Sequence, residues 1–234
     1  MTMDADVIII GGGLVGATLA LALARHEVTS IVVDAQDLDS TTLPAFDGRA
    51  TAVASASARM LRALGLGDIL DTHGCPIREI RVTDAAHPQF LHFDAGEGND
   101  PLGTMVENRW LRTGLLRAVR ECPEVTLLAP VTVADLARDD HAATLTLAAG
   151  RVFRAPLVVA CDGRRSATRE AAGIPLATWQ YDHAALITMV AHTVPHENIA
   201  CELFYPSGPL ALLPMRDTDD GRPRTAIVWT IDRK

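Results

Sequence analysis

The sequence predicts an α/β protein, in which a Rossmann-type domain with a mixed sheet is followed by part of an antiparallel β-sheet domain. Three observations predict this fold class. The apolar run Val7–Ile10 leads through a glycine turn into a helical stretch, and a second apolar run covers residues 29–34. After residue 175, four strand-length apolar runs follow one another without helices between them. Hydrophobic residues make up 48% of the 234 residues, enough for an ordinary globular core.

The first 34 residues predict a complete β-α-β unit. Val7–Ile10 is β-branched without a polar break, which is typical of a strand buried on both faces of a parallel sheet. Three glycines, Gly11 to Gly13, stop this strand. Residues 14–25 are rich in Ala and Leu, with no Gly after Gly16 and no Pro, and therefore predict a helix. Residues 29–34 predict the second strand.

The later elements follow from the same periodicities. Before residue 175 we expect helices over residues 50–64, 109–121 and 164–172, and strands over 77–83, 89–93, 125–128, 131–136, 143–147, 152–155 and 157–160, with a small antiparallel meander over 131–155. After it we expect antiparallel strands over 185–193, 199–205, 210–215 and 225–231. The expected domains are residues 1–175, with inserted short strands at about 77–93, and residues 176–234.

Charge and composition exclude several classes of function. The formal net charge is −8 and no basic stripe is present, which argues against nucleic-acid binding. The four cysteines have no C-x-x-C pair or metal-ligand spacing, so we expect reduced thiols and no metal site. Two acids precede the first apolar run, and no run approaches the ~18 residues of a membrane span. The expected location is therefore the cytoplasm. The four cysteines are Cys75, Cys122, Cys161 and Cys201.

The strongest motif is the G-x-G-x-x-G between the first strand and the first helix. Gly11 permits a tight turn, Gly13 lets a pyrophosphate approach the backbone, and Gly16 lets the helix pack on the strand. The helix N-terminus offers unpaired N–H groups to the phosphates. The alternative is a glycine-rich turn without a ligand. The cofactor-binding residues predicted from this motif are Gly11, Gly13, Leu14, Val15 and Gly16.

Asp34 ends the second strand, 23 residues after Gly11, close to the spacing of a ribose-binding acid. Its carboxylate would accept hydrogen bonds from ribose hydroxyls and would repel a 2′-phosphate, which argues against NADP at this site. The alternative is a solvated acid at a strand end.

Three further candidates lie before or at the starts of predicted helices. Residues 162–169 have the form D-G-x-x-S-x-x-R, which is either a ligand-binding turn around Asp162 or an ordinary helix start capped by Ser166 or Asp162. Arg49 precedes the helix expected over residues 50–64, and Arg109 begins the helix expected over residues 109–121. Each could contact a phosphate or a ribityl hydroxyl. The alternative for both arginines is a solvated side chain.

These motifs, in this order, resemble the flavoprotein aromatic hydroxylases of the para-hydroxybenzoate hydroxylase type, over the whole chain. Finer features resemble the branch that hydroxylates polyprenylated phenols in ubiquinone biosynthesis. Residues 47–52 resemble its D-G-R-A-T-A segment, and residues 107–112 its E-N-R-x-L-R segment. Residues 204–214 resemble its F-x-x-x-G-P-x-A-x-L-P segment, and residues 228–229 the V-W that follows.

The resemblance implies that the first domain binds FAD. Asp34 would meet the adenosine ribose, although members of this family more often carry Glu there. Arg49 and Arg109 would contact the flavin side, and Asp162 would bind FAD. The implied reaction uses NAD(P)H to reduce the flavin and O2 to hydroxylate an electron-rich phenolic ring. The sequence predicts no catalytic acid or base, because its eight histidines fall into no nucleophile–base arrangement.

One feature of that family has no counterpart in this sequence: a third FAD motif, with Gly-Asp followed by a Pro- and Gly-containing loop. We therefore expect the N-terminal portion of a hydroxylase, with apolar surface exposed where the rest would pack. The other open interpretations are a truncated FAD-binding module without catalysis and a related flavin reductase or halogenase, which the G-P-x-A-x-L-P segment disfavours. A polyprenylated substrate implies peripheral contact with the inner face of the membrane or with a biosynthetic complex.

Overall fold

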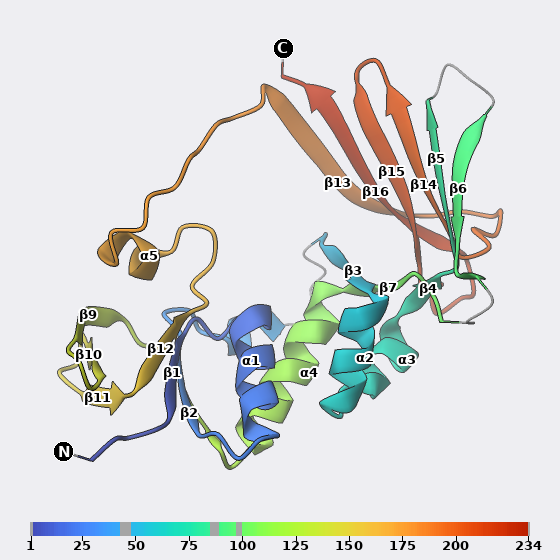
Figure 1. Cartoon of the computed structure of the whole chain (residues 1–234). Coiled ribbons are helices and arrows are strands. Elements are labelled where there is room, and N and C mark those ends of the chain that lie inside the picture. The colour runs from blue at the N-terminus through green and yellow to red at the C-terminus, as the bar shows by residue number, and fades with distance from the viewer. Residues whose placement is uncertain (1, 43–47, 85–88, 97–99, 234) are drawn as a thin grey trace. The chain divides into compact units, whose positions relative to one another are not determined.

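The computed structural model describes residues 2–42, 48–84, 89–96 and 100–233 (Figure 1). The chain forms two compact units, and each unit is made from two separate stretches of sequence. The first contains residues 1–44 and 111–178, and the second contains residues 45–110 and 179–234. Both units are therefore discontinuous along the chain.

A four-stranded parallel sheet organises the first unit. Its strand order is β12-β1-β2-β8, and every neighbouring pair is parallel. The strands are β1 (Val7–Ile10), β2 (Ser30–Val33), β8 (Val125–Leu128) and β12 (Leu157–Ala160). All residues of β1 and β2 are buried, as expected for strands that lack a solvent-facing side. The predicted β-α-β unit is confirmed.

The helices of the first unit follow the predicted periodicities. Helix α1 (Leu14–Ala24) connects β1 to β2, and α4 (Asn108–Glu121) buries the apolar face predicted by its helical spacing. The first three residues of α4 belong to the second unit. A short 3-10 helix, η1 (Asp39–Thr42), follows β2. Helix α5 (Ala167–Ala171) is shorter than the predicted 164–172, because Ser166 caps its N-terminus and residues 164–165 lie in a turn.

The predicted antiparallel meander is present and covers part of the parallel sheet. Its strands are β9 (Val133–Arg138), β10 (Ala143–Leu147) and β11 (Val152–Ala155), in the order β11-β10-β9. One hydrophobic core joins the meander to the sheet, and among its members are Ile8, Ile31, Leu145, Leu147 and Phe153.

A six-stranded sheet dominates the second unit. Its order is β13-β16-β15-β14-β5-β6, and all pairs are antiparallel except β14 with β5. The strands are β5 (Glu79–Asp84), β6 (Phe90–Asp94), β13 (His183–Ala191), β14 (Ile199–Tyr205), β15 (Gly208–Met215) and β16 (Arg224–Asp232). The parallel pair makes this the mixed sheet of the protein. It carries exposed large apolar side chains, among them Leu91, Leu186, Ile187, Phe204 and Trp229.

A small sheet packs beside it within the same unit. Its strands, in the order β3-β7-β4, are β3 (Ala50–Ala54), β7 (Gly103–Glu107) and β4 (Cys75–Ile77), and two short helices, α2 (Ser55–Ala63) and α3 (Gly67–His73), accompany it. The buried residues Cys75, Ile77, Met105, Ala200, Met215 and Ala226 form the core between the two sheets.

The prediction of one helix over residues 50–64 was wrong in its first third. Residues 50–54 form β3, because they pair residue by residue with β7, and this ladder outweighs the helix preference of three alanines. β7 itself was not predicted, and its five residues are all buried.

Residues 45–110 group with the six-stranded sheet, whereas the sequence predicts residues 1–175 as one FAD-binding domain. The grouping follows from the pairing of β5 with β14, which ties the short strands at 77–93 to the sheet beyond residue 175. A functional division near residue 175 stays a prediction. Over the part of the chain that the structure describes, no helix combines the length and the apolar character needed to cross a bilayer.

Candidate functional site

The glycine turn between β1 and α1 is packed too closely for side chains at two positions. Gly11 has a φ of +105°, and a Cβ there would lie 2.4 Å from the carbonyl oxygen of Cys161. A Cβ on Gly16 would lie 1.8 Å from the carbonyl oxygen of Gly11. Both contacts are with backbone, which has little room to move, so glycine is required at both positions. The turn is thereby held against α1 and against the end of β12.

Gly13 differs from these two glycines because it faces open space. Apart from its chain neighbours and the backbone of its own helix, no atom of the described residues lies within 4 Å of a Cβ built there. Gly13 is the N-cap of α1, no side chain caps the helix, and its first turn carries no acid. Leu14 is half-buried and Val15 is 70% exposed. An anion could therefore approach the N–H groups at this helix start and gain from the helix dipole.

Asp34 fixes the glycine turn from the end of β2. Its Oδ2 accepts a hydrogen bond from the N–H of Gly12 at 2.7 Å, and its Oδ1 accepts one from the N–H of Gln36 at 2.7 Å. Each carboxylate oxygen can accept a further bond, because it has two lone pairs. Asp34 is thus a structural anchor that retains the capacity to bind hydroxyl groups, rather than only a solvated acid.

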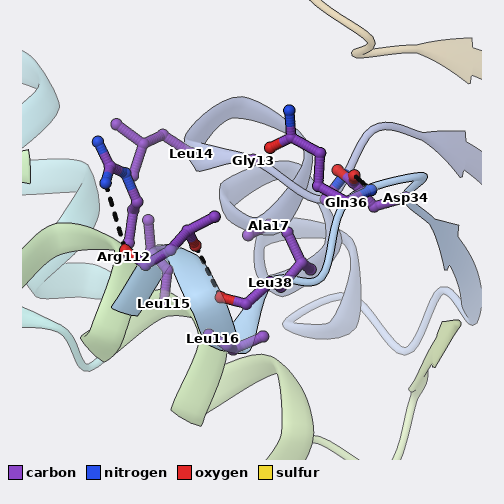
Figure 2. A pocket seen from close by; sticks show the side chains of 11 residues that line it. Gly13, Leu14, Ala17, Asp34, Gln36, Leu38, Arg112, Leu115 and Leu116 are labelled. Atoms are coloured by element: carbon purple, nitrogen blue, oxygen red, sulfur yellow. Dashed lines mark hydrogen bonds between the residues drawn. The ribbon is translucent and has the colours of Figure 1, made fainter. Parts of the chain in front are cut away.

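A pocket opens between the start of α1, the segment after β2, and α4 (Figure 2). Its volume of about 120 Å³ is below the roughly 300–1,000 Å³ that encloses a whole drug-sized ligand, so it suits one part of a dinucleotide. Asp34 and Gln36 lie on one side of it and Arg112 on the other. The residues that line it are Gly12, Gly13, Leu14, Ala17, Asp34, Gln36, Leu38, Thr41, Arg112, Leu115 and Leu116.

Sequence reasoning missed the lining contributed by α4. Arg112 precedes Leu115 and Leu116 by three and four residues, so all three share one face of the helix. Leu115 and Leu116 are buried, and an arginine on the same face was a signal that could have pointed to the pocket. Gln36, Leu38 and Thr41 follow Asp34 without a recognisable motif.

Asp162 lies next to the glycine turn, within the first unit. Its backbone nitrogen would be 2.8 Å from a Cβ on Gly11. Its Oδ2 accepts hydrogen bonds from the N–H and the hydroxyl of Thr168, at 3.1 and 2.9 Å. Burial raises the pKa of Asp162, but the hydrogen bonds to its carboxylate outweigh this effect and hold the pKa below its ordinary value. Oδ1 is buried and accepts no hydrogen bond from the described residues.

The D-G-x-x-S-x-x-R segment folds as a capped helix start. The Oγ of Ser166 accepts a hydrogen bond from the N–H of Arg169 at 2.9 Å, which is the N-cap geometry of α5. The side chain of Arg169 donates to the carbonyl oxygen of Arg164 at 3.2 Å. Ser166 is therefore the observed cap, while Asp162 accepts the N–H one residue earlier, from Thr168.

Arg49 and Arg109 belong to the second unit, where β3 and β7 bring their segments together. The N–H of Asn108 donates to the carbonyl oxygen of Arg49 at 3.0 Å, and the hydroxyl of Thr51 donates to Oδ1 of Asn108 at 2.6 Å. The two segments are therefore joined within one small sheet, although they are far apart in sequence. Asp47, the first residue of the D-G-R-A-T-A segment, lies outside the described residues.

Glu107 holds Arg109 in place. Neither Glu107 nor its second partner, Arg224, was predicted as a site residue. Only 2% of the Glu107 side chain is exposed. Its Oε2 lies 2.7 Å from Nε of Arg109, as an ion pair without hydrogen-bond alignment, and its Oε1 accepts a hydrogen bond from Nη2 of Arg224 at 2.9 Å. Glu107 thus shares its charge between two guanidinium groups.

An aromatic stack supports the same arginine. The guanidinium of Arg109 lies 4.8 Å from the ring centroid of Trp110, and Trp110 stacks on His73 with ring centroids 3.9 Å apart. Burial lowers the pKa of His73, and the nearby charges of Arg216 and Arg109 lower it further. Glu107 acts in the opposite direction, but the net effect holds the pKa of His73 below its ordinary value.

The structure thus distributes the predicted residues over both units. Gly11, Gly13, Leu14, Val15, Gly16, Asp34 and Asp162 lie in the first unit, and Arg49 and Arg109 lie in the second. A family model described as "FAD binding domain" matches residues 4–234. The chain belongs to the FAD-binding domain family.

Curated relatives of this FAD-binding domain include enzymes of ubiquinone metabolism. The chain is 44% identical over 226 residues to ubiquinone hydroxylase UbiL of Rhodospirillum rubrum, covering 97% of this chain and 52% of that protein. It is 36% identical over 217 residues to 3-demethoxyubiquinol 3-hydroxylase of Escherichia coli, covering 91% of this chain and 55% of that protein. The chain spans about half the length of the curated relatives it matches.

The same fold occurs in a solved structure of pqsL, a probable FAD-dependent monooxygenase from Pseudomonas aeruginosa. The two share a TM-score of 0.79 at 22% sequence identity, over 98% of this chain and 61% of that one. The predicted α/β fold class and the predicted family are confirmed.

The residues of the first unit fit FAD. Open space over Gly13, the acid-free start of α1 and the spare acceptor capacity of Asp34 suit a diphosphate followed by a ribose.

Proposed function

We propose that this chain belongs to an FAD-dependent monooxygenase, and that this enzyme hydroxylates a polyprenylated phenol in ubiquinone biosynthesis with NAD(P)H and O2. The observation that carries the proposal is the match of nearly the whole chain to a ubiquinone hydroxylase and to a demethoxyubiquinol hydroxylase. The family assignment to an FAD-binding domain supports it, because bound FAD supplies the redox chemistry that such a reaction needs.

The first unit would hold the adenosine half of FAD. The N–H groups at Gly13, Leu14 and Val15 would bind the diphosphate at the start of α1. Asp34 would accept hydrogen bonds from the ribose hydroxyls and would repel a 2′-phosphate. Gly11 and Gly16 would act indirectly, because they allow the close packing that places this backbone.

The remaining predicted residues would act elsewhere on the cofactor. Arg49 and Arg109 would contact its flavin side, and the fixed position of Arg109 between Glu107 and Trp110 supports a binding role over a solvated one. Asp162, with one buried oxygen that accepts no hydrogen bond within the described chain, would receive a donor from the cofactor.

A polyprenylated substrate would reach the protein from a lipid surface. We therefore propose that the complete protein works in the cytoplasm, with peripheral contact to the inner face of the membrane or to a biosynthetic complex. Co-sedimentation with vesicles that contain a prenylated phenol, compared with vesicles that lack it, tests this contact.

The activity itself is tested by oxygen incorporation. The complete natural protein is given NADH, a short-chain prenylated phenol and ¹⁸O₂, and the product is analysed by mass spectrometry. Incorporation of one labelled oxygen supports the proposal. NADH oxidation without labelled product favours a flavin reductase, and FAD binding without NADH oxidation favours a binding module. A Gly11→Val variant, whose side chain would clash with the backbone of Cys161, is the control and should lose FAD and product together.

A further inference from the structure

We propose that Arg112, the last residue of the E-N-R-x-L-R segment, binds the diphosphate of the cofactor, a role for which the motifs named no cation. The inference deepens the proposed function and rests on FAD as the ligand of this site. Its basis is the place of Arg112 in the pocket that also contains Gly13, Leu14 and Asp34. Among the described residues that line this pocket, Arg112 carries the positive charge and Asp34 the negative one.

The two charges are on opposite sides of the pocket. Figure 2 shows Asp34 and Gln36 on one side, Arg112 on the other, and Gly13 between them in the view. A ribose bound to Asp34 would direct the attached phosphates toward the start of α1. The diphosphate would then extend from the open position at Gly13 toward the side occupied by Arg112.

A cation in this pocket would improve the charge balance of a bound diphosphate. A diphosphate carries about two negative charges, whereas a helix N-terminus offers the equivalent of roughly half a positive charge. Helix α1 has no basic or acidic residue in its first turn that changes this value. A guanidinium binds phosphate oxygens with directed, charge-assisted hydrogen bonds, so Arg112 supplies what the glycine motif lacks.

Arg112 is fixed on a rigid element. It lies on the buried face of α4, next to Leu115 and Leu116, and is half-buried itself. Its Nη1 donates to the carbonyl oxygen of Thr41 at 3.2 Å, which ties the guanidinium to the segment after β2. A cation that is already ordered loses little conformational entropy when the anion binds.

The test is calorimetric titration of the 234-residue chain with ADP, at two salt concentrations. Arg112→Gln should weaken ADP binding roughly ten-fold or more, because a hydrogen bond to a charged group is lost, and it should also reduce the salt dependence of binding. Arg112→Lys keeps the charge, so its affinity for ADP should lie between those of the wild type and Arg112→Gln. Arg117→Gln is the matched control: it removes the same charge from an exposed position on α4 and should leave binding unchanged.

A comparison with Asp34→Asn separates a phosphate contact from a structural role. Asp34→Asn should weaken ADP binding without reducing its salt dependence, because it removes no positive charge from the pocket. The inference is overturned if Arg112→Gln binds ADP like the wild type, if it weakens binding without changing the salt dependence, or if the wild-type chain binds no ADP. Thermal melting checks that each variant is folded, and a destabilised Arg112→Gln is replaced in the comparison by Arg112→Lys. A protein that binds FAD but fails to hydroxylate refutes the proposed function and leaves this result intact.

Discussion

Replacement of Glu107 by alanine removes a carboxylate that two guanidinium groups share inside the second unit. Glu107 is almost fully buried, and it contacts Nε of Arg109 and Nη2 of Arg224 at 2.7 and 2.9 Å. The variant leaves two cations close together with their common anion gone. We expect it to be destabilised and to hold Arg109 less firmly.

The magnitude follows from the burial of the three groups. Removal of one partner from a buried ion pair costs about 3–5 kcal/mol, because the other charge stays buried without compensation. The side chains of Arg109 and Arg224 are 22% and 21% exposed, so water can reach them in part. We therefore expect the lower end of the range, about 3 kcal/mol. At a urea slope of about 2 kcal/mol per M, this lowers the unfolding midpoint by roughly 1.5 M.

Tryptophan fluorescence is the appropriate assay, because Trp110, Trp179 and Trp229 all belong to the second unit. The matched control is Asp71→Ala. Asp71 pairs with Arg62 through two hydrogen bonds, but their side chains are 59% and 50% exposed. Such a surface pair contributes below about 1 kcal/mol. Equal midpoints for Glu107→Ala and Asp71→Ala would refute the reasoning, since burial is what distinguishes the two carboxylates.

Three further outcomes follow from the structure. Gly16→Ala places a Cβ 1.8 Å from the carbonyl oxygen of Gly11, so it should lower the melting temperature and abolish FAD binding; a variant with wild-type values contradicts the packing. The pKa of Asp162 is lowered, so its contribution to stability is present above the ordinary value of 3.8 and is lost as the pH falls below it; in Asp162→Asn this part of the acid-induced loss of stability should be absent. Burial raises the pKa of Cys75 to about 11, so this thiol should resist alkylation at pH 8 until urea unfolds the chain; rapid labelling of the native protein would show that the site is open.

The sequence predicted the fold best where interacting elements are close together along the chain. The first β-α-β unit follows from a buried strand, a glycine turn and an uninterrupted helix, all within 34 residues, and each part restricts the next. The strands β10, β11, β12 and β14 have the predicted boundaries for the same reason, because alternation or an unbroken apolar run identifies them directly.

Non-local pairing explains what could not be predicted. Residues 50–54 have helix-forming composition and become a strand because β7 is beside them, and β7 contains a glycine, a threonine and an acid that obscure its strand pattern. The parallel pairing of β5 with β14 joins segments that no local pattern relates. Arg112 and Glu107 were missed because their partners, Thr41 and Arg224, come from distant parts of the chain.

Each unit is made from two separate stretches of the chain, and this has a consequence for synthesis on the ribosome. β1 gains its first neighbour early, when β2 emerges, but its other edge is covered only when Leu157 pairs with Val7. β5 likewise waits for β14 before its parallel partner exists. Until then, apolar strand edges are open to wrong partners, and the high contact order slows correct closure. A nascent chain of this protein should therefore depend on holdase chaperones until Tyr205, the last residue of β14, has left the tunnel.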